Sequence, residues 1–178
     1  MKYLITERQY NSIKEQEEEV LSFPFAFFNY DWDLVLSAMK GRPFHIQGDL
    51  DLAYAEIESL GNLRSVGGNL DLFHSPLKSL GNLEYVSYSL FLNNSKIKSL
   101  GNLRSVERHL VMSDTNITSF GNLEYVGGDL DLERTKIESF GNVKYVGKDL
   151  YLEDSLILKK YSEDQIRQMI NIGGFIII

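Results

Sequence analysis

Ser79-Leu80-Gly81-Asn82-Leu83 is one copy of a five-residue motif that recurs every twenty residues along this chain. Four further copies begin at Ser59, Ser99, Ser119 and Ser139, the last two with phenylalanine before the glycine. A fixed period of this length is typical of a solenoid, in which each repeat forms one coil stacked on the previous one. The motif therefore predicts a long stack of coils, whose extended surface suits holding other molecules better than enclosing an active site.

Apolar residues also recur from coil to coil at six fixed positions. In one coil these positions are Val86, Leu90, Leu92, Ile97, Leu100 and Leu103. The Leu-x-Leu spacing has a period of two, so it predicts a short β-strand with both leucines facing the core. Stacking at about 4.8 Å per coil then places like side chains over like. We therefore expect a β-rich repeat solenoid of about six coils.

Two polar positions recur just as regularly. Asparagine follows the glycine of the motif at Asn62, Asn82, Asn102, Asn122 and Asn142. We expect the glycine to permit a bend and the asparagine amide to be buried, where it satisfies backbone groups of the turn. Small hydroxyl residues occupy the other position, at Ser75, Ser95, Thr115, Thr135 and Ser155, and can bond local backbone. Because every coil carries both, we interpret them as structural rather than as a ligand-binding ladder.

Leu70, Leu72 and Leu77 belong to the pattern G-x-x-L-x-L-x-x-S-x-L, in which Gly67 and Ser75 are the other fixed residues. With S-[LF]-G-N-[LV] in the second half of the coil, this pattern resembles the leucine-rich repeat family, whose L-x-x-L-x-L-x-x-N-x-L has leucine and asparagine at those two positions. The spacing of the repeated residues is similar to that of receptor L domains and of short irregular repeats in bacterial and phage proteins. The resemblance covers residues 44–158 and implies protein recognition through the sheet face. Since a twenty-residue coil has little room for a convex helix, we expect a straighter, β-helix-like stack.

A stack of coils exposes an apolar layer at each end, so terminal caps are expected. We expect a single domain with a helical N-terminal cap over 1–43, the repeats over 44–160 and a C-terminal cap over 161–178. At the N-terminus, Thr6-Glu7-Arg8-Gln9 is a capping-box pattern that opens a helix reaching Leu21. A second helix is expected over Asp31 to Lys40.

Aromatic residues are dense between Phe23 and Trp32. We interpret them as a cover for the first coil, with a binding site as the alternative. At the other end, Ser162-Glu163-Asp164-Gln165 is a second capping-box pattern with Ile166, Met169 and Ile170 behind it. The apolar run Phe175 to Ile178 would be an aggregation hazard if exposed, so we expect it to pair with the last coil.

Composition excludes several classes of function. The chain has 178 residues, a net charge of −7 and no cysteine, so disulfides, thiolate metal sites and cysteine nucleophiles are absent and a cytoplasmic location is expected. No apolar run is long enough to cross a membrane, and residues 1–8 show no secretory signal. Without a basic stripe, nucleic-acid binding is not expected.

Catalytic motifs are missing as well. The chain has no P-loop, G-x-S-x-G or H-E-x-x-H sequence, and His45, His74 and His109 lie in different coils without a metal-ligand partner. We therefore expect no enzyme activity, no catalytic residue, no cofactor and no metal.

Charged positions carry further repeats. Arg64, Glu84, Arg104, Glu124 and Lys144 alternate in sign from coil to coil, which predicts cross-coil ion pairs that help to fix the stacking. Outward acids at Asp49, Asp51, Asp71, Asp129, Asp131 and Asp149 could in principle hold Ca²⁺. We interpret them instead as a solvated face.

The outward strand positions break the polar pattern in the middle coils. Phe91 and Val111 stand between the two inward residues of their strands, where three other coils have aspartate and the last has Tyr151. Phe73 is expected within reach of Phe91. An exposed apolar patch with a polar border usually marks a contact surface, although tolerated surface hydrophobicity is the alternative. The candidate partner-binding residues are Asp71, Phe73, Tyr88, Phe91, His109, Val111, Asp131, Glu133 and Tyr151.

These observations favour a non-enzymatic protein-binding module, a small cytoplasmic inhibitor or adaptor of bacterial or phage origin, whose protein partner has a basic surface. A phage origin would suit an anti-defence role, by analogy only. The alternatives are a structural component of a larger assembly such as a virion, and a carbohydrate- or Ca²⁺-binding surface. Partner identity and oligomeric state stay open.

Overall fold

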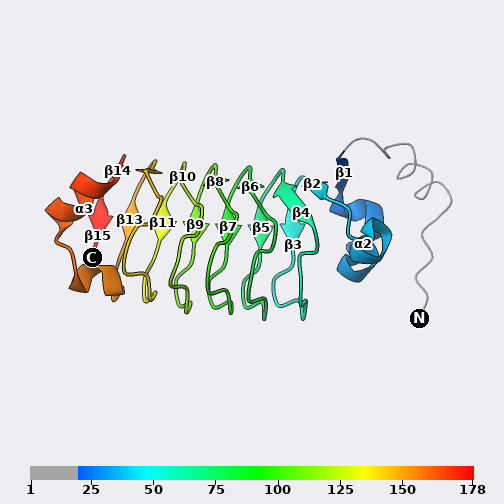
Figure 1. Ribbon diagram of the computed structural model, residues 1–178, viewed down its shortest axis with the longest axis horizontal. Helices are drawn as coiled ribbons and strands as arrows, with labels where there is room; N and C mark the ends of the chain where they lie inside the picture. The colour runs from blue at the N-terminus through cyan, green and yellow to red at the C-terminus, as the bar shows by residue number, and fades with distance from the viewer. Residues whose placement is uncertain (1–19) are drawn as a thin grey trace.

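The computed structural model describes residues 20–178 as an elongated stack of coils (Figure 1). Its strands form two sheets, one with eight strands and one with seven, and neighbouring strands are parallel. The first helix predicted for the N-terminal cap lies outside the described residues, and Leu21 begins a strand rather than continuing that helix. The predicted β-solenoid is confirmed.

Sheet 2, the seven-stranded sheet, is built from the Leu-x-Leu positions. Its strands are β3 (Leu50–Asp51), β5 (Leu70–Asp71), β7 (Leu90–Phe91), β9 (Leu110–Val111), β11 (Leu130–Asp131), β13 (Leu150–Tyr151) and β15 (Ile176–Ile177). Each residue pairs with the one twenty positions away, as Leu90 does with Leu110, except where β15 joins β13. Both leucines of the middle coil, Leu90 and Leu92, are 0% exposed, which confirms the predicted inward direction.

Sheet 1, the eight-stranded sheet, lies on a second side of the coil and was not predicted. Its strands are β1 (Leu21–Pro24), β2 (Phe44–Gln47), β4 (Leu63–Val66), β6 (Tyr85–Val86), β8 (Ser105–Val106), β10 (Tyr125–Val126), β12 (Tyr145–Val146) and β14 (Asn171–Ile172). Within the repeats, β6, β8, β10 and β12 each have one buried residue, such as Val86, so no period-two apolar pair marks them in the sequence. Strands β1 and β2, at the start of the stack, do alternate, with Leu21 and Phe23 and then Phe44 and Ile46 buried. With sheets on two sides and no helix between residues 44 and 155, the coil is β-helix-like, as expected.

Left-handed backbone makes the corners. The motif glycines Gly61, Gly81, Gly101, Gly121 and Gly141 have φ between 55° and 61°. Glycine adopts this region without steric cost, so the bend predicted at the motif is confirmed. A second corner, after each strand of sheet 2, uses other residues, from Tyr54 and His74 to Arg134 and Asp154.

The asparagines of the motif are not buried, contrary to the prediction. Asn102, Asn122 and Asn142 are exposed, and Asn62 and Asn82 are half-buried. Leucines on both sides of the Gly-Asn corner turn inward, so the asparagine points out at the bend. The asparagine still links coils, because Asn142 Nδ2 donates to the Gly121 carbonyl at 3.1 Å.

The hydroxyl residues are buried and mostly bond local backbone, as predicted. Thr115 Oγ1 donates to the Met112 carbonyl at 2.7 Å and Thr135 Oγ1 to the Leu132 carbonyl at 2.8 Å. Ser95 and Ser155 are also buried, but their hydroxyls have no partner among the described protein atoms.

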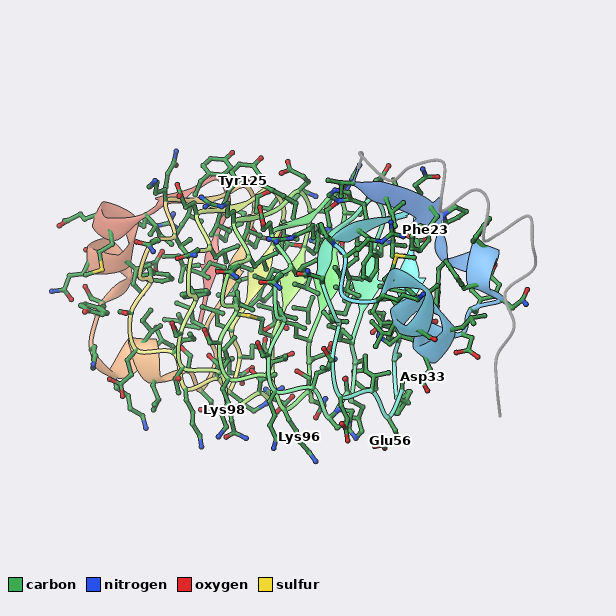
Figure 2. The ribbon with its side chains drawn as sticks, turned by 45° about the vertical axis from the view of Figure 1, so that its right-hand side comes forward. Phe23, Asp33, Glu56, Lys96, Lys98 and Tyr125 are labelled. Carbon is green, nitrogen blue, oxygen red and sulfur yellow. The ribbon has the colours of Figure 1, made fainter. Side chains whose placement is uncertain are left out.

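Aromatic residues close the N-terminal end, as predicted. Helix α2 (Trp32–Met39) begins at Asp31, whose carboxylate accepts from Leu34 N at 3.0 Å, and ends at Lys40. The 3-10 helix η1 (Phe25–Phe28) precedes it. The ring of Phe23, at this end of the stack (Figure 2), is stacked on the ring of Phe44 in the first coil, with 5.8 Å between the ring centroids. The aromatic cluster therefore covers the apolar layer of the first coil.

The C-terminal segment adds a seventh turn to the stack. Helix α3 (Glu163–Met169) follows the 3-10 helix η2 (Leu156–Lys159) and carries the predicted capping box of Ser162 and Gln165. Strands β14 and β15 then pair with β12 and β13. The pairing of β15 is the one expected for the apolar C-terminal run, although Phe175 and Ile178 on either side of it are exposed. Ile166 and Ile170 are buried, whereas Met169 is 47% exposed, contrary to expectation. None of the described helices is long and apolar enough to cross a membrane.

Candidate interaction surface

The strand register places the predicted outward residues of sheet 2 side by side. Asp71 pairs with Phe91, Phe91 with Val111, Val111 with Asp131, and Asp131 with Tyr151. All five are half-buried, which is normal for the outer face of a strand with a neighbour on each side. The structure therefore brings Phe91 and Val111 together on the outer face of adjacent middle coils.

The aspartates in this row have a local structural role that the sequence did not reveal. Asp71 Oδ1 accepts from Phe73 N at 2.9 Å, and Asp131 Oδ1 accepts from Glu133 N at 2.9 Å. Asp51 does the same for Ala53 N at 3.0 Å. Phe91 and Val111 have no acceptor to offer, so the two middle coils give up this turn-stabilising bond and place apolar groups outside instead.

Phe73 joins a different aromatic group from the one expected. Its ring centroid lies 5.1 Å from Tyr54 and 5.1 Å from His74. Within residues 20–178, no ring contact joins Phe73 to Phe91, so the expected closeness of these two rings is not seen. Tyr54, which is 66% exposed, was not among the predicted residues, although its position between Ala53 and Ala55 in the first repeat could have suggested it.

Tyr88 and His109 lie at the corner where sheet 1 turns into sheet 2. Tyr88 is 47% exposed and lies 5.3 Å from the Arg108 guanidinium, a cation–π contact. His109 Nδ1 lies 3.2 Å from Asp129 N and 2.9 Å from Asp129 Oδ2. Tyr88 is therefore partly exposed with Arg108 over its ring, while His109 is bonded to Asp129 of the next coil.

His109 belongs to a ladder of side-chain acceptors along this corner. In each coil the side chain accepts from the backbone N–H of the equivalent residue one coil further on, at 2.6 to 3.4 Å. The accepting residues are Asp49, Asn69, Ser89, His109, Asp129 and Asp149. The shared signal in the sequence is that all six carry a short side-chain acceptor, although their chemistry differs.

Acidic groups lie on both sides of the Phe91–Val111 pair. On the N-terminal side, a hollow of about 270 Å³ beside Phe91 is lined by Asp49, Asp51 and Asp71. On the C-terminal side, Tyr151 is surrounded by the carboxylates of Asp129, Asp131, Glu133 and Asp149. Burial first, and then these carboxylates, raise the pKa of the Tyr151 phenol. The surface thus has an apolar centre between two acidic ends.

The alternating charges beside sheet 1 pair in part as predicted, since four of the five form ion pairs and Arg104 forms none within the described residues. Arg64 Nη1 lies 2.7 Å from Glu84 Oε1, and Lys144 pairs with Glu124. At the corner after sheet 2, Arg134 donates two hydrogen bonds to Asp114, of 2.6 and 2.8 Å, and thereby lowers the pKa of that carboxyl. Across residues 20–178, no three His, Asp or Glu side chains are placed to hold a metal ion together.

Comparisons of the chain with protein-family models, curated proteins and solved structures give no match. The assignment of its architecture therefore rests on the twenty-residue period and on the parallel register of the two sheets. The chain is a repeat β-solenoid with leucine-rich strands.

Proposed function

We propose that this chain is a non-enzymatic protein-binding module and that its partner binds the outer face of sheet 2, centred on Phe91 and Val111. One observation carries the proposal. At the outward strand position, Asp71 and Asp131 stabilise the following turn, yet the two coils between them have Phe91 and Val111. Stacking the coils does not require apolar groups there, so a contact surface supplies the reason for them.

The layout of the surface supports a protein partner. An apolar centre with a polar border is the usual arrangement of a protein interface. Aromatic residues at such a centre often carry a large share of the affinity, so Phe91 is the expected anchor. Tyr88, at the neighbouring corner, adds a second exposed ring.

The charges favour a partner with a basic surface. Asp49, Asp51 and Asp71 form no ion pair within the described residues, and they line the hollow beside Phe91. A lysine or arginine of the partner would meet a ring and three carboxylates there. Salt should weaken the association, because exposed charges are screened over roughly 10 Å at moderate ionic strength.

A small inhibitor or adaptor of bacterial or phage origin, acting in the cytoplasm, is the role we favour. Its support is the resemblance of the leucine-rich coils to short irregular leucine-rich repeats, together with the absence of cysteine. Those repeats are commonly used for protein recognition, which agrees with an outward sheet face as the site.

A structural component of a larger assembly is the second candidate, and one observation favours it. At the C-terminal end of the stack, Phe175 is 73% exposed and Ile178 is 68% exposed, beside the last strand of each sheet. Such an end could pack against another subunit.

Capture from a lysate of the native host tests the main proposal. Wild type, Phe91→Asp and the matched control Tyr85→Asp, which changes an exposed aromatic of sheet 1, are compared as baits. We expect a stoichiometric partner with wild type and with Tyr85→Asp, and none with Phe91→Asp. Equal capture by all three folded baits would contradict the proposal, and loss with Tyr85→Asp alone would move the site to sheet 1.

A further inference from the structure

A hollow of about 330 Å³ lies at the corner between the two sheets, in the C-terminal half of the stack. It has a simple origin. Gly127 and Gly128 carry no side chains, whereas the coil before them carries Glu107 and Arg108 and the coil after them carries Lys148. The missing side chains of one coil leave a gap between the side chains of its two neighbours.

The backbone places Gly128 directly between the two cationic residues. Gly128 N donates to the Arg108 carbonyl at 2.9 Å, and Lys148 N donates to the Gly128 carbonyl at 3.1 Å. Arg108 and Lys148 are therefore two coil spacings apart, about 10 Å between backbones. Their long side chains can reach a group that sits over the glycine.

Neither cation is neutralised by a carboxylate in the part of the chain that the structure describes. Arg64, Arg134 and Lys144 each pair with an acid of the neighbouring coil. Arg108 instead lies on the face of the Tyr88 ring, which leaves the N–H donors at the edge of its guanidinium free to bind. Both Arg108 and Lys148 line the hollow.

Glu107 and His109, two other polar residues of the lining, already have partners. Glu107 is its one carboxylate, and Glu107 Oε1 accepts from Ser105 Oγ at 2.9 Å on the sheet 1 side. His109 is bound to Asp129. Glu107 keeps its negative charge, so the lining has two cations, Arg108 and Lys148, against one carboxylate, and its balance is positive.

We infer that this hollow binds a compact oxyanion, a phosphate or carboxylate group, between Arg108 and Lys148. A guanidinium presents paired donors that match two oxygens of such a group, and an ammonium adds a second charge from the opposite side. The ring of Tyr88 restrains the guanidinium, and so reduces the entropy that binding would cost. This inference goes beyond the proposed function, because it concerns the free protein and depends on Arg108 and Lys148, which are not among the proposed partner-binding residues; Tyr88 and His109 border both surfaces.

The test is a titration of the full ¹⁵N-labelled chain with inorganic phosphate at constant ionic strength, followed by NMR. We expect saturable shifts of the Gly127, Gly128 and Lys148 amides. Arg108→Gln and Lys148→Gln should each weaken binding by about tenfold, since each removes charge-assisted hydrogen bonds. Glu107→Gln should strengthen binding, and the control Lys136→Gln, which changes a lysine on another side of the coil, should leave it unchanged.

Several results would overturn the inference. They are shifts that do not saturate, shifts spread equally over the exposed lysines, or unchanged affinity in both Arg108→Gln and Lys148→Gln. Because Arg108→Gln and Lys148→Gln are separate variants, the test still decides if one of them folds poorly. The opposite effect expected of Glu107→Gln distinguishes a change in charge from a general loss of structure in the variant. A parallel titration with acetate identifies the group: binding of phosphate alone assigns a phosphate site, and binding of both assigns a general oxyanion site.

Discussion

At the scale of single residues, side-chain acceptors connect one coil to the next. The ladder from Asp49 to Asp149 takes the backbone N–H groups of one corner, and the outward aspartates take those of the turns after sheet 2. These roles depend on an oxygen or nitrogen at a fixed place rather than on one residue type. The sequence pattern therefore predicted only a solvated face for the outward acids, and it did not indicate that their carboxylates accept backbone hydrogen bonds.

Asp129 offers a direct test of the ladder. Asp129→Ala removes the acceptor of Asp149 N and the partner of His109, so we expect the free energy of unfolding to fall by about 1 kcal/mol. Asp129→Asn keeps an acceptor oxygen and should stay near wild type. Urea unfolding of the three proteins measures the difference, and equal loss in both variants would mean that charge, not the hydrogen bond, matters.

Asn102 tests the exposed asparagine column. A buried amide would have cost about 1–3 kcal/mol on removal, but Asn102 is exposed and donates to the Gly81 carbonyl over 3.4 Å. Asn102→Ala should therefore change the free energy of unfolding by less than about 0.5 kcal/mol. A clear drop in melting temperature would show that the corner amide is more tightly held than its exposure indicates.

At the scale of elements, the strand of sheet 2, helix α2 and the capping box of α3 were predictable, because each has a local pattern with a known period or cap. Sheet 1 was not predictable as a sheet, since a pair such as Tyr85–Val86 has one inward residue and no alternation to detect. Its formation depends on the neighbouring coils, which supply the hydrogen-bond partners.

Helix α3 tests the C-terminal cap with a matched pair of variants. Ile166 is 0% exposed and Met169 is 47% exposed on the same helix. Ile166→Asp buries an unpaired charge and should release the cap and cause aggregation, whereas Met169→Asp should stay monomeric and folded. Size-exclusion chromatography separates these outcomes. A monomeric, cooperative Ile166→Asp protein would show that the stack tolerates an open end.

His45 in β2 makes the stability of sheet 1 depend on pH. Burial lowers the pKa of His45 below its usual 6.5, and its Nδ1 lies 2.5 Å from Ser65 Oγ. A lowered pKa means that the neutral ring contributes stability above about pH 6.5, and that this contribution is lost as the pH falls through the folded pKa. His45→Gln should therefore lose less stability than wild type between about pH 7.5 and pH 5.5. Equal loss in urea unfolding would place the pH dependence elsewhere.

At the scale of the whole molecule, the uninterrupted twenty-residue period decided the fold, the register and the direction of the Leu-x-Leu side chains. It also brought Phe91 and Val111 together, because fixed register leaves no freedom in which residues are neighbours. The period could not show the grouping of Phe73 with Tyr54, or the hollow at Gly127 and Gly128, since both arise at positions where the residue type changes from coil to coil. The repeat thus predicts the backbone and the core, whereas the residues that differ between coils form the surface features specific to this chain.

The unfolding free energy of Phe91→Asp, measured together with capture of the partner, tests the central claim most directly. The new carboxylate stands where Asp71 and Asp131 stabilise their turns, which offsets the partial burial that the ring loses. We predict stability within about 1 kcal/mol of wild type together with loss of the partner. A loss of stability of about 3 kcal/mol or more, as for a core residue, or full capture by the folded variant, would contradict the account.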